Sequence, residues 1–171
     1  MNPFKHFLAS LALAFVAAVS FAPAANAQAL TDSAENAIVD AVLRGQALGA
    51  PATFYVALDT TACSDSAAGT EVTGGSYARV AVTSSLANWA GTQSAGSTTA
   101  SSGTGGQTSN NAVITFPAPT ANWGSVGWFR LVSASTGGTT WFCQALTTAK
   151  TVNNGDAAPS FAIGAMTFTF Q

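Results

Sequence analysis

Apolar residues recur at every second position through most of the chain, which is the pattern of β-strands with one buried face. Phe54, Val56 and Leu58 illustrate this pattern, because all three project to the same side of a strand. The segments 126–133 and 140–146 are apolar on both faces, as central strands are. The strands predicted in this way are 53–59, 77–83, 112–116, 126–133, 140–146 and 166–171, and a further short strand begins at Phe161.

Turn-forming residues separate these runs, at Gly74-Gly75, Gly137-Gly138 and 153–156. Short antiparallel strands at this spacing predict an all-β domain over residues 51–171. We expect an antiparallel β-sandwich of jelly-roll type.

Residues 28–50 precede the strands and show helical spacing instead. Asp32 and Glu35 have the separation of an N-cap and an N3 residue in a capping box, and Gly45 is placed to end the helix. One amphipathic N-terminal helix is therefore predicted, followed by a linker, and it packs on the sandwich or docks on a neighbouring subunit. The apolar stripe that predicts the helix consists of Ala34, Ala37, Ile38, Ala41 and Val42.

Residues 1–27 have the composition of a secretory signal peptide. A positive start at Lys5 is followed by an apolar core over 7–21 and by Ala25-Asn26-Ala27, a small-x-small cleavage site. The alternative is an uncleaved membrane anchor, but the apolar run is near the short end for spanning a bilayer and Pro23 interrupts it. We expect cleavage after residue 27, no membrane association afterwards, and a secreted or cell-surface protein.

Charge is scarce along the chain. Asp, Glu, Lys and Arg make up only 7% of the 171 residues, against about 25% in an ordinary soluble domain. Five cationic side chains are too few to follow a phosphate backbone, so nucleic acid is excluded as a partner. The surface must consist of small polar side chains with little mutual repulsion, which predicts close packing between identical subunits.

Residues 91–111 are nearly all Gly, Ser, Thr, Gln and Asn. A tract of this composition lacks the apolar side chains that a core needs, so we expect an exposed loop within the sandwich domain. We interpret it as a tolerated insertion, with a variable contact loop as the alternative.

Cys63 and Cys143 are the two cysteines of the chain. In an oxidising compartment they predict one disulfide, with two buried free thiols as the alternative. A zinc site is not expected, because it needs four ligands and the single histidine lies within the predicted leader.

Without histidine, the mature chain has neither a Ser-His-Asp nor a Cys-His arrangement. Two carboxylates could hydrolyse a glycoside, or several could bind calcium. The acidic residues in question stand at strand ends and turns, where Asp is common because it hydrogen-bonds the backbone; they are Asp59, Asp65, Glu71 and Asp156. We therefore predict no enzyme activity, no metal and no cofactor.

Aromatic residues that share a strand face with an arginine are candidate subunit contacts. Tyr77 and Arg79 share one predicted face, and Trp128 and Arg130 share another. Aromatic and arginine side chains are enriched at interfaces, so we predict subunit contacts here, with exposed patches as the alternative. The tryptophans could also stack on a sugar, although core or interface packing is commoner; they are Trp89, Trp123, Trp128 and Trp141.

A set of short motifs also occurs in a characteristic order. The set is AENAIVD (34–40), YVAL (55–58), GTEV (69–72), GSYAR (75–79), ITFP (114–117), WGSV (123–126), TGG (136–138), LTTAKTV (146–152), GD (155–156) and GAMTFT (164–169). Over residues 33–170 this order resembles a family of small tailed-phage virion proteins of the tail-fibre or head-decoration kind. The resemblance implies a compact β-sandwich that assembles on a larger particle and has no known catalytic residues. The signal peptide and the cysteine pair depart from that pattern, which suggests a phage-type module reused on a bacterial surface.

The leading hypothesis is an exported, non-enzymatic structural subunit that self-assembles into, or coats, a surface layer, filament or particle. One alternative is an adhesin-like module that binds a surface glycan or a receptor. The other is a phage decoration or tail-fibre-associated protein located in the virion.

Overall fold

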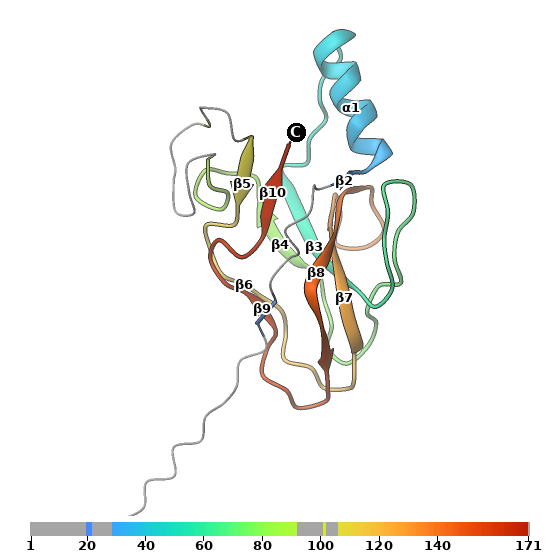
Figure 1. Ribbon diagram of the computed structural model, residues 1–171, viewed down its shortest axis with the longest axis vertical. Helices are drawn as coiled ribbons and strands as arrows, with labels where there is room; N and C mark the ends of the chain where they lie inside the picture. The colour runs from blue at the N-terminus through green and yellow to red at the C-terminus, as the bar shows by residue number, and fades with distance from the viewer. Residues whose placement is uncertain (1–19, 22–28, 92–100, 102–105, 171) are drawn as a thin grey trace, which may run out of the picture.

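The computed structural model describes residues 20–21, 29–91, 101 and 106–170. Within them the chain is mostly antiparallel β-structure with a single helix, so the predicted all-β class is confirmed (Figure 1). The elements are β1 (Ser20–Phe21), β2 (Ala29–Leu30), α1 (Asp32–Leu43), β3 (Thr53–Asp59), β4 (Val80–Thr83), β5 (Gln107–Ser109), β6 (Ile114–Thr115), β7 (Gly124–Val132), β8 (Thr140–Val152), β9 (Ser160–Phe161) and β10 (Thr167–Thr169).

The strands form three sheets. A five-stranded antiparallel sheet has the order β2-β8-β7-β3-β4, a three-stranded sheet has the order β1-β9-β6, and β10 pairs with β5. Aromatic rings bridge the large sheet and the small ones: the ring centroid of Phe129 on β7 lies 5.2 Å from that of Phe161 on β9 and 6.1 Å from that of Phe168 on β10. The sheets therefore face one another across a shared core, as in a sandwich. The jelly-roll connection stays a prediction.

The large sheet follows the sequence pattern most closely. β3 has the predicted bounds, and Val56 and Leu58 are fully buried as the alternation requires. β8 continues to Val152, well beyond its predicted end at residue 146. It pairs with β7 along most of its length but with β2 only at Phe142 and Cys143. Within the described residues, the remaining edge of β8 has no neighbouring strand.

The strand predicted over 77–83 begins only at Val80. Positive φ angles at Gly74, Gly75 and Ser76 form a turn just before it. Gly75 is packed so closely that an added Cβ would lie 3.0 Å from the backbone of Ala121. The turn takes the following residues, including Tyr77, out of the β-ladder, so their side chains follow no strand alternation.

The end of the polar tract joins the core, unlike the exposed loop predicted over 91–111. Residues 107–109 form β5, paired with β10, and Asn110 is fully buried. The Asn110 side chain donates to two backbone carbonyls and accepts the N–H of Met166. A polar side chain is stable in this core because its hydrogen-bonding groups have partners. The segments 92–100 and 102–105 of the predicted loop lie outside the described residues.

Helix α1 differs from the prediction at its start. The N-cap is Thr31 rather than Asp32, and its side chain makes no capping bond, so the predicted capping box is wrong. The Thr31 hydroxyl donates instead to the carbonyl of Thr140 at 2.5 Å, which ties the start of the helix to β8. The end of the helix is confirmed, because Gly45 follows it at φ 68°. Figure 1 shows α1 projecting from one end of the body, and of its residues only Ala34 is fully buried.

Two residues of the predicted leader form a strand, and one of them lies in the core. Ser20 and Phe21 pair in parallel with β9, and the fully buried Phe21 ring lies 5.1 Å from that of Phe161. Residues 1–19 and 22–28 lie outside the described part of the chain, and cleavage after Ala27 stays a prediction. Over the described residues, no helix has both the length and the apolar character needed to cross a bilayer.

Candidate functional site

The predicted disulfide is confirmed. Cys63 and Cys143 are bonded, with Cα atoms 5.9 Å apart. Cys143 lies on β8 directly opposite Arg130 of β7, so both project from the same face of the large sheet. We call this the outer face, because Phe129 and Leu131 enter the core from the other side. The bond holds the start of residues 60–79, which we call the cover segment, against the outer face.

Asp59 and Arg130 form a buried ion pair beneath the cover segment. Arg130 Nε lies 2.5 Å from Asp59 Oδ2, and Arg130 Nη2 lies 2.9 Å from Oδ1, so the contact is bidentate. Their side chains are 6% and 0% exposed. The register sets Asp59 opposite Trp128 and Arg130 opposite Ala57, which makes the two charged residues diagonal neighbours on β3 and β7.

Glu71 of the cover segment extends this pair into a network. Its carboxylate accepts hydrogen bonds from Arg79 at 2.8 and 2.6 Å and from Arg130 at 3.1 Å. The Tyr77 hydroxyl donates to Glu71 at 3.1 Å and accepts the N–H of Leu58 at 2.8 Å. Arg79 also donates to two backbone carbonyls between β7 and β8. We call these five residues the charge network: Asp59, Glu71, Tyr77, Arg79 and Arg130.

Electrostatics inside the network favour its ionised form. Burial alone would raise the pKa of Glu71, but the Arg79 hydrogen bonds and the charges of both arginines outweigh burial and lower this pKa. The Glu71 hydrogen bond raises the pKa of Arg79. Burial raises the pKa of the Tyr77 phenol well above its ordinary range, and the adjacent Glu71 carboxylate adds to the rise. Two arginines therefore face two carboxylates around a neutral phenol.

The carboxylates of the charge network bind arginine side chains rather than a metal cation. Asp59 and Glu71, which the sequence offers for calcium, do meet in a β-bridge, but arginine guanidinium groups bind their oxygens. Asp65, the third candidate, accepts the N–H of Ser66. Within the described residues, no group of three or more His, Cys, Asp or Glu side chains could hold a metal ion.

The structure places three of the four interface candidates in the charge network. Tyr77, Arg79 and Arg130 meet inside the protomer, in the charge network. Trp128 is half-buried on the same outer face. A subunit contact through these residues stays a prediction. The signal that could have found the internal pairing is Arg130 itself, since an arginine within an apolar central strand requires a buried counter-ion.

The tryptophans do not share one surface. Trp89 packs against Phe168 at 5.9 Å, and Trp141 packs against Phe54 at 6.0 Å, each distance joining ring centroids. Trp123 is buried, and its ring N–H donates to the Gly75 carbonyl at 2.9 Å. Core packing, the commoner role, accounts for these three.

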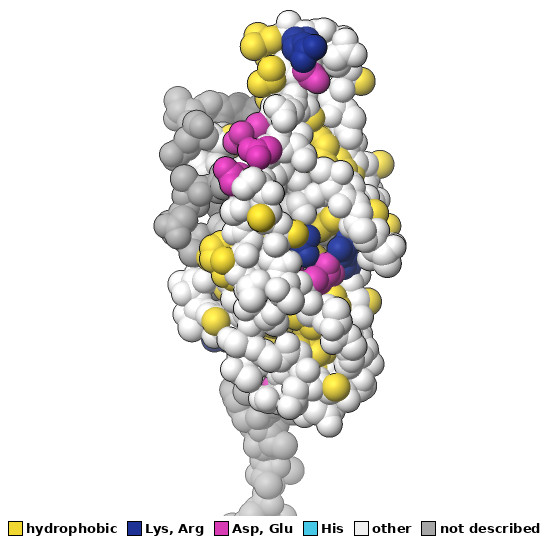
Figure 2. Space-filling view, turned by 90° about the vertical axis from the view of Figure 1, so that its right-hand side faces the viewer, with side chains coloured by type: hydrophobic (Ala, Val, Ile, Leu, Met, Phe, Trp, Pro, Cys, Tyr) yellow, Lys and Arg dark blue, Asp and Glu magenta, His cyan; other side chains and the backbone are white. Residues whose placement is uncertain are grey.

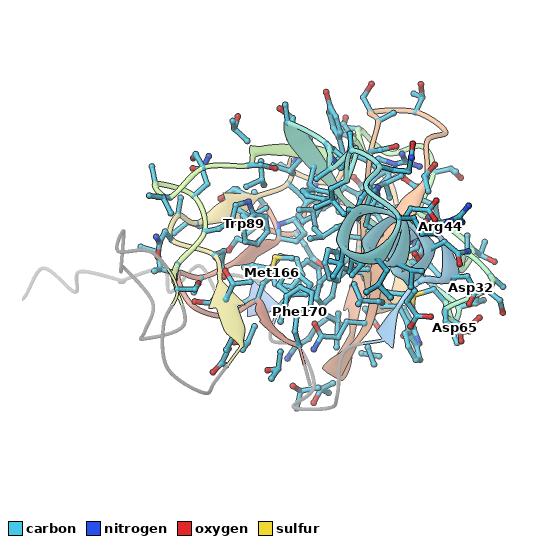
Figure 3. All side chains as sticks on the ribbon, turned by 90° about the horizontal axis from the view of Figure 1, so that it is seen from above. Asp32, Arg44, Asp65, Trp89, Met166 and Phe170 are labelled. Carbon is cyan, nitrogen blue, oxygen red and sulfur yellow. A yellow bond between two sulfur atoms is a disulfide. The ribbon has the colours of Figure 1, made fainter. Side chains whose placement is uncertain are left out.

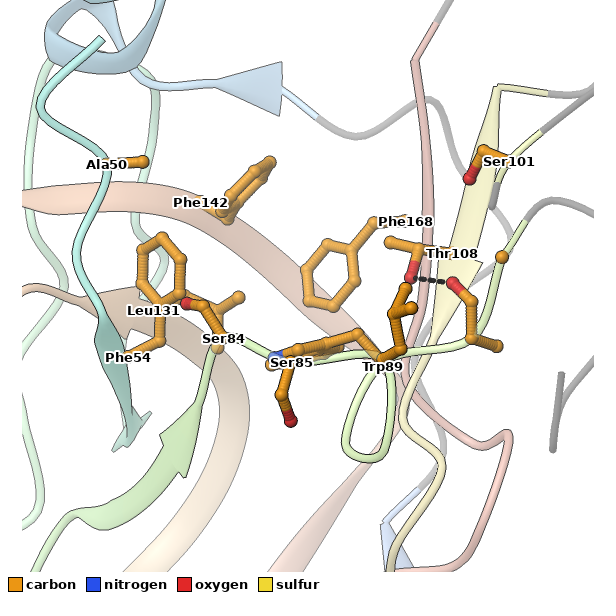
Figure 4. Close-up of a pocket in the computed structure, with 13 residues that line it drawn as sticks. Ala50, Phe54, Ser84, Ser85, Trp89, Ser101, Thr108, Leu131, Phe142 and Phe168 are labelled. Carbon is orange, nitrogen blue, oxygen red and sulfur yellow. Dashed lines mark hydrogen bonds between the residues drawn. The ribbon is translucent and has the colours of Figure 1, made fainter. Parts of the chain in front are cut away.

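An apolar pocket of about 520 Å³ opens at the end of the molecule from which α1 projects (Figure 4). None of the residues that line it is charged. Phe54 and Phe142 contribute from the large sheet and Phe168 from β10, so the pocket lies between two layers of the sandwich. Leu86, which lines the pocket, is 56% exposed. The volume falls in the range of small-molecule and side-chain binding sites.

Comparison with known protein families places these features in context. A family model described as Gp80, podophage GP4 fiber I protein gp80, matches residues 29–169. The matched range runs from β2 to the end of β10 and contains α1, the charge network and both cysteines. Among curated proteins, no sequence matches the chain.

Proposed function

The chain belongs to the Gp80 family, that of the podophage GP4 fiber I protein gp80, and from this premise we propose that it is a non-enzymatic structural subunit of a phage-type fibre or surface assembly. The observation that carries the proposal is the extent of the match, which includes every strand from β2 to β10. The face in Figure 2 is mostly neutral, with few charged side chains. Such a surface supports assembly, because identical subunits can approach without strong repulsion.

The use of the ionisable groups supports a structural role rather than a catalytic one. Acid–base catalysis requires a carboxylate that faces a substrate and exchanges a proton with it. Asp59 and Glu71 instead bind Arg130 and Arg79 beneath the cover segment. Their arrangement joins β3, β7 and the cover segment, which is what a subunit under load or protease exposure needs.

Two settings are consistent with this role. An exported subunit at the cell surface follows from the predicted signal peptide and from the disulfide, whereas a virion location follows from the family. Mass spectrometry of the natural protein separates them. A chain that starts at Gln28 supports export, and a chain that retains the leader supports the virion setting.

Varying the concentration of the purified protein tests the assembly proposal. Sedimentation velocity of the purified protein should show larger species as its concentration rises, and negative-stain microscopy should show regular particles or filaments. A monomer at millimolar concentration, with no regular object in natural material, would contradict the proposal.

Recognition of a glycan or receptor is the second candidate function. Trp89 favours it, since this partly buried ring lines an open apolar pocket and aromatic rings stack on sugars. Trp89→Ala should then abolish binding to a glycan array or to intact cells. Trp141→Ala is the matched control, because Trp141 does not line the pocket.

A further inference from the structure

The free end of α1 is apolar on a side that the body does not cover. Val39, Val42 and Leu43 follow the i, i+3, i+4 spacing of one helix face, and they are 48%, 73% and 79% exposed. Leu48, just beyond the helix, is 42% exposed. We call these four residues the helix tip. A helix with apolar residues on its outer as well as its inner side is normally covered on both, so the tip lacks a partner among the described residues of its own protomer.

The charges near the tip do not oppose an apolar partner. Asp40 in the last turn of α1 and Arg44 at the C-cap are the charged residues near the tip, and they pair with each other at 2.7 Å. Figure 2 shows hydrophobic side chains beside a basic and an acidic side chain at the top of the molecule. The tip therefore presents two leucines and two valines, and the charges of Asp40 and Arg44 nearby are already neutralised by their pairing.

The tip and the apolar pocket are complementary surfaces at the same end of the molecule (Figures 1 and 4). The pocket has an uncharged lining with the exposed Leu86 beside it, and the tip has aliphatic side chains of a size that the volume accommodates. We propose that the helix tip of one copy occupies the apolar pocket of a second copy, and that the second copy returns the same contact. This inference rests on the proposed function and names the partner and the surface for one step of the assembly.

The helix cannot fill its own pocket. Its start is fixed by the Thr31 hydroxyl on β8 and by the Asp32 N–H, which donates to the carbonyl of Asp65 at 3.1 Å. Figure 3 shows α1, with Arg44 and Asp32, set apart from Trp89 of the pocket. Reaching the pocket would require both anchoring bonds to break. A second copy needs no such rearrangement.

The contact area agrees with a reciprocal dimer. An exposed apolar patch of this kind amounts to on the order of a few hundred Å². A reciprocal contact uses two tips and two pockets, and so approaches the roughly 1,200 Å² that small specific interfaces bury. Because the tip and the pocket lie at one end, the two copies meet end to end and the contact closes on itself.

Sedimentation equilibrium of the full chain and two variants tests the contact. Leu43→Asp brings a carboxylate into the uncharged pocket, and Leu86→Lys brings an ammonium to its opening, so each should raise the dimer Kd at least ~100-fold. Mixing the two variants should restore part of the association, because one of the two reciprocal contacts then joins the intact tip of the Leu86→Lys copy to the intact pocket of the Leu43→Asp copy. Val113→Asp changes another exposed apolar residue, 54% exposed and next to β6, and should leave the Kd unchanged.

Several outcomes would overturn the inference. Dimerisation by the Leu43→Asp variant would remove the tip from the contact. Dimerisation by Leu86→Lys alone, with Leu43→Asp monomeric, would show that tips pack on tips. If larger assemblies form equally well in both variants, the structural role stands and this contact is wrong. If the wild-type protein never associates, the proposed structural role and this contact are both wrong. Circular dichroism spectra that superimpose on the wild-type spectrum establish that the variants are folded.

Discussion

Asp59 and Arg130 are 71 positions apart in the chain, yet they form a two-point ion pair on the outer face of the large sheet. Their immediate neighbours, Leu58 and Phe129, are fully buried on the opposite face. The same two strands thus carry the hydrophobic core on one side and an ion pair on the other. The cover segment makes this possible, because it shields the pair and supplies Glu71 and Arg79.

Removing Arg130 should destabilise the protein strongly. Arg130→Met leaves the Asp59 carboxylate buried without its cation, and breaking such a pair costs about 3–5 kcal/mol. The unfolding free energy measured by urea titration should fall by that amount. The double variant Arg130→Met with Asp59→Leu should recover part of the loss. A loss below about 1 kcal/mol in the single variant would show that the pair matters little.

Protonation of Glu71 at low pH should lower the stability of the protein. The folded-state pKa of Glu71 is lowered from its ordinary 4.5, so the unfolded chain binds a proton first as the pH drops. The stabilisation from Glu71 is therefore present above pH 4.5 and is lost as the pH falls through the lowered pKa. Urea midpoints between pH 3 and pH 7 measure this change. The Glu71→Gln variant should be less stable at pH 7, and its urea midpoint should change less with pH below pH 4.5. If the midpoint of the variant falls with acid as steeply as that of the wild type, Glu71 is not the source of the loss.

Reducing the disulfide should lower stability without changing the fold. Cys63 and Cys143 are 80 positions apart, and closing a loop of that length restricts the unfolded chain by about 4 kcal/mol. The urea midpoint should drop when a thiol reductant is added. The double variant Cys63→Ser with Cys143→Ser should start at the lower midpoint and show no response to reductant.

Asn110→Ala should lower the free energy of unfolding, although it replaces only one polar side chain in a polar tract. It removes the side-chain partner of the buried Met166 N–H and of two partly buried carbonyls, which predicts a loss of about 2–3 kcal/mol. Asn111→Ala, on the neighbouring and more exposed residue, is the matched control and should cost less.

Deleting 92–105 should preserve the fold, whereas deleting 91–111 should abolish it. Thermal unfolding distinguishes the two deletions.

Phe21 gives a test of what the leader contributes. In the full chain, Phe21→Ala removes a fully buried ring from the contacts with Phe116 and Phe161, and should cost about 3–5 kcal/mol. Ser20→Ala, at the exposed neighbouring position, should change little. A chain that begins at Gln28 should lose a similar amount relative to the full chain. Equal stability of Phe21→Ala and wild type would show that Phe21 does not support the core.

Local patterns predicted much of the fold. Alternation alone located β3, and two cysteines in a chain with a predicted signal peptide predicted the bond between Cys63 and Cys143, because both signals can be found without knowing how the sheets pack. The charge network was not predictable in this way. Alternation marks which residues share a face, but it does not reveal that Tyr77 and Arg79, after a turn at 74–76, bind Glu71, which also binds Arg130.

The exposed loop predicted from composition over residues 91–111 was wrong at its end. The polar tract ends in a short strand and the buried Asn110, because backbone pairing with β10 and the bonds of Asn110 replace apolar contacts. A composition rule counts side chains and takes no account of such pairing. The apolar pocket was equally beyond prediction, since its walls come from segments that meet only after the sheets pack.

Lys150 limits how these molecules can aggregate. It stands exposed toward the end of β8, so a copy that laid its own β8 alongside would have to desolvate an ammonium group or place two of them close together. One lysine thereby discourages amyloid-like stacking and leaves orderly association to other surfaces.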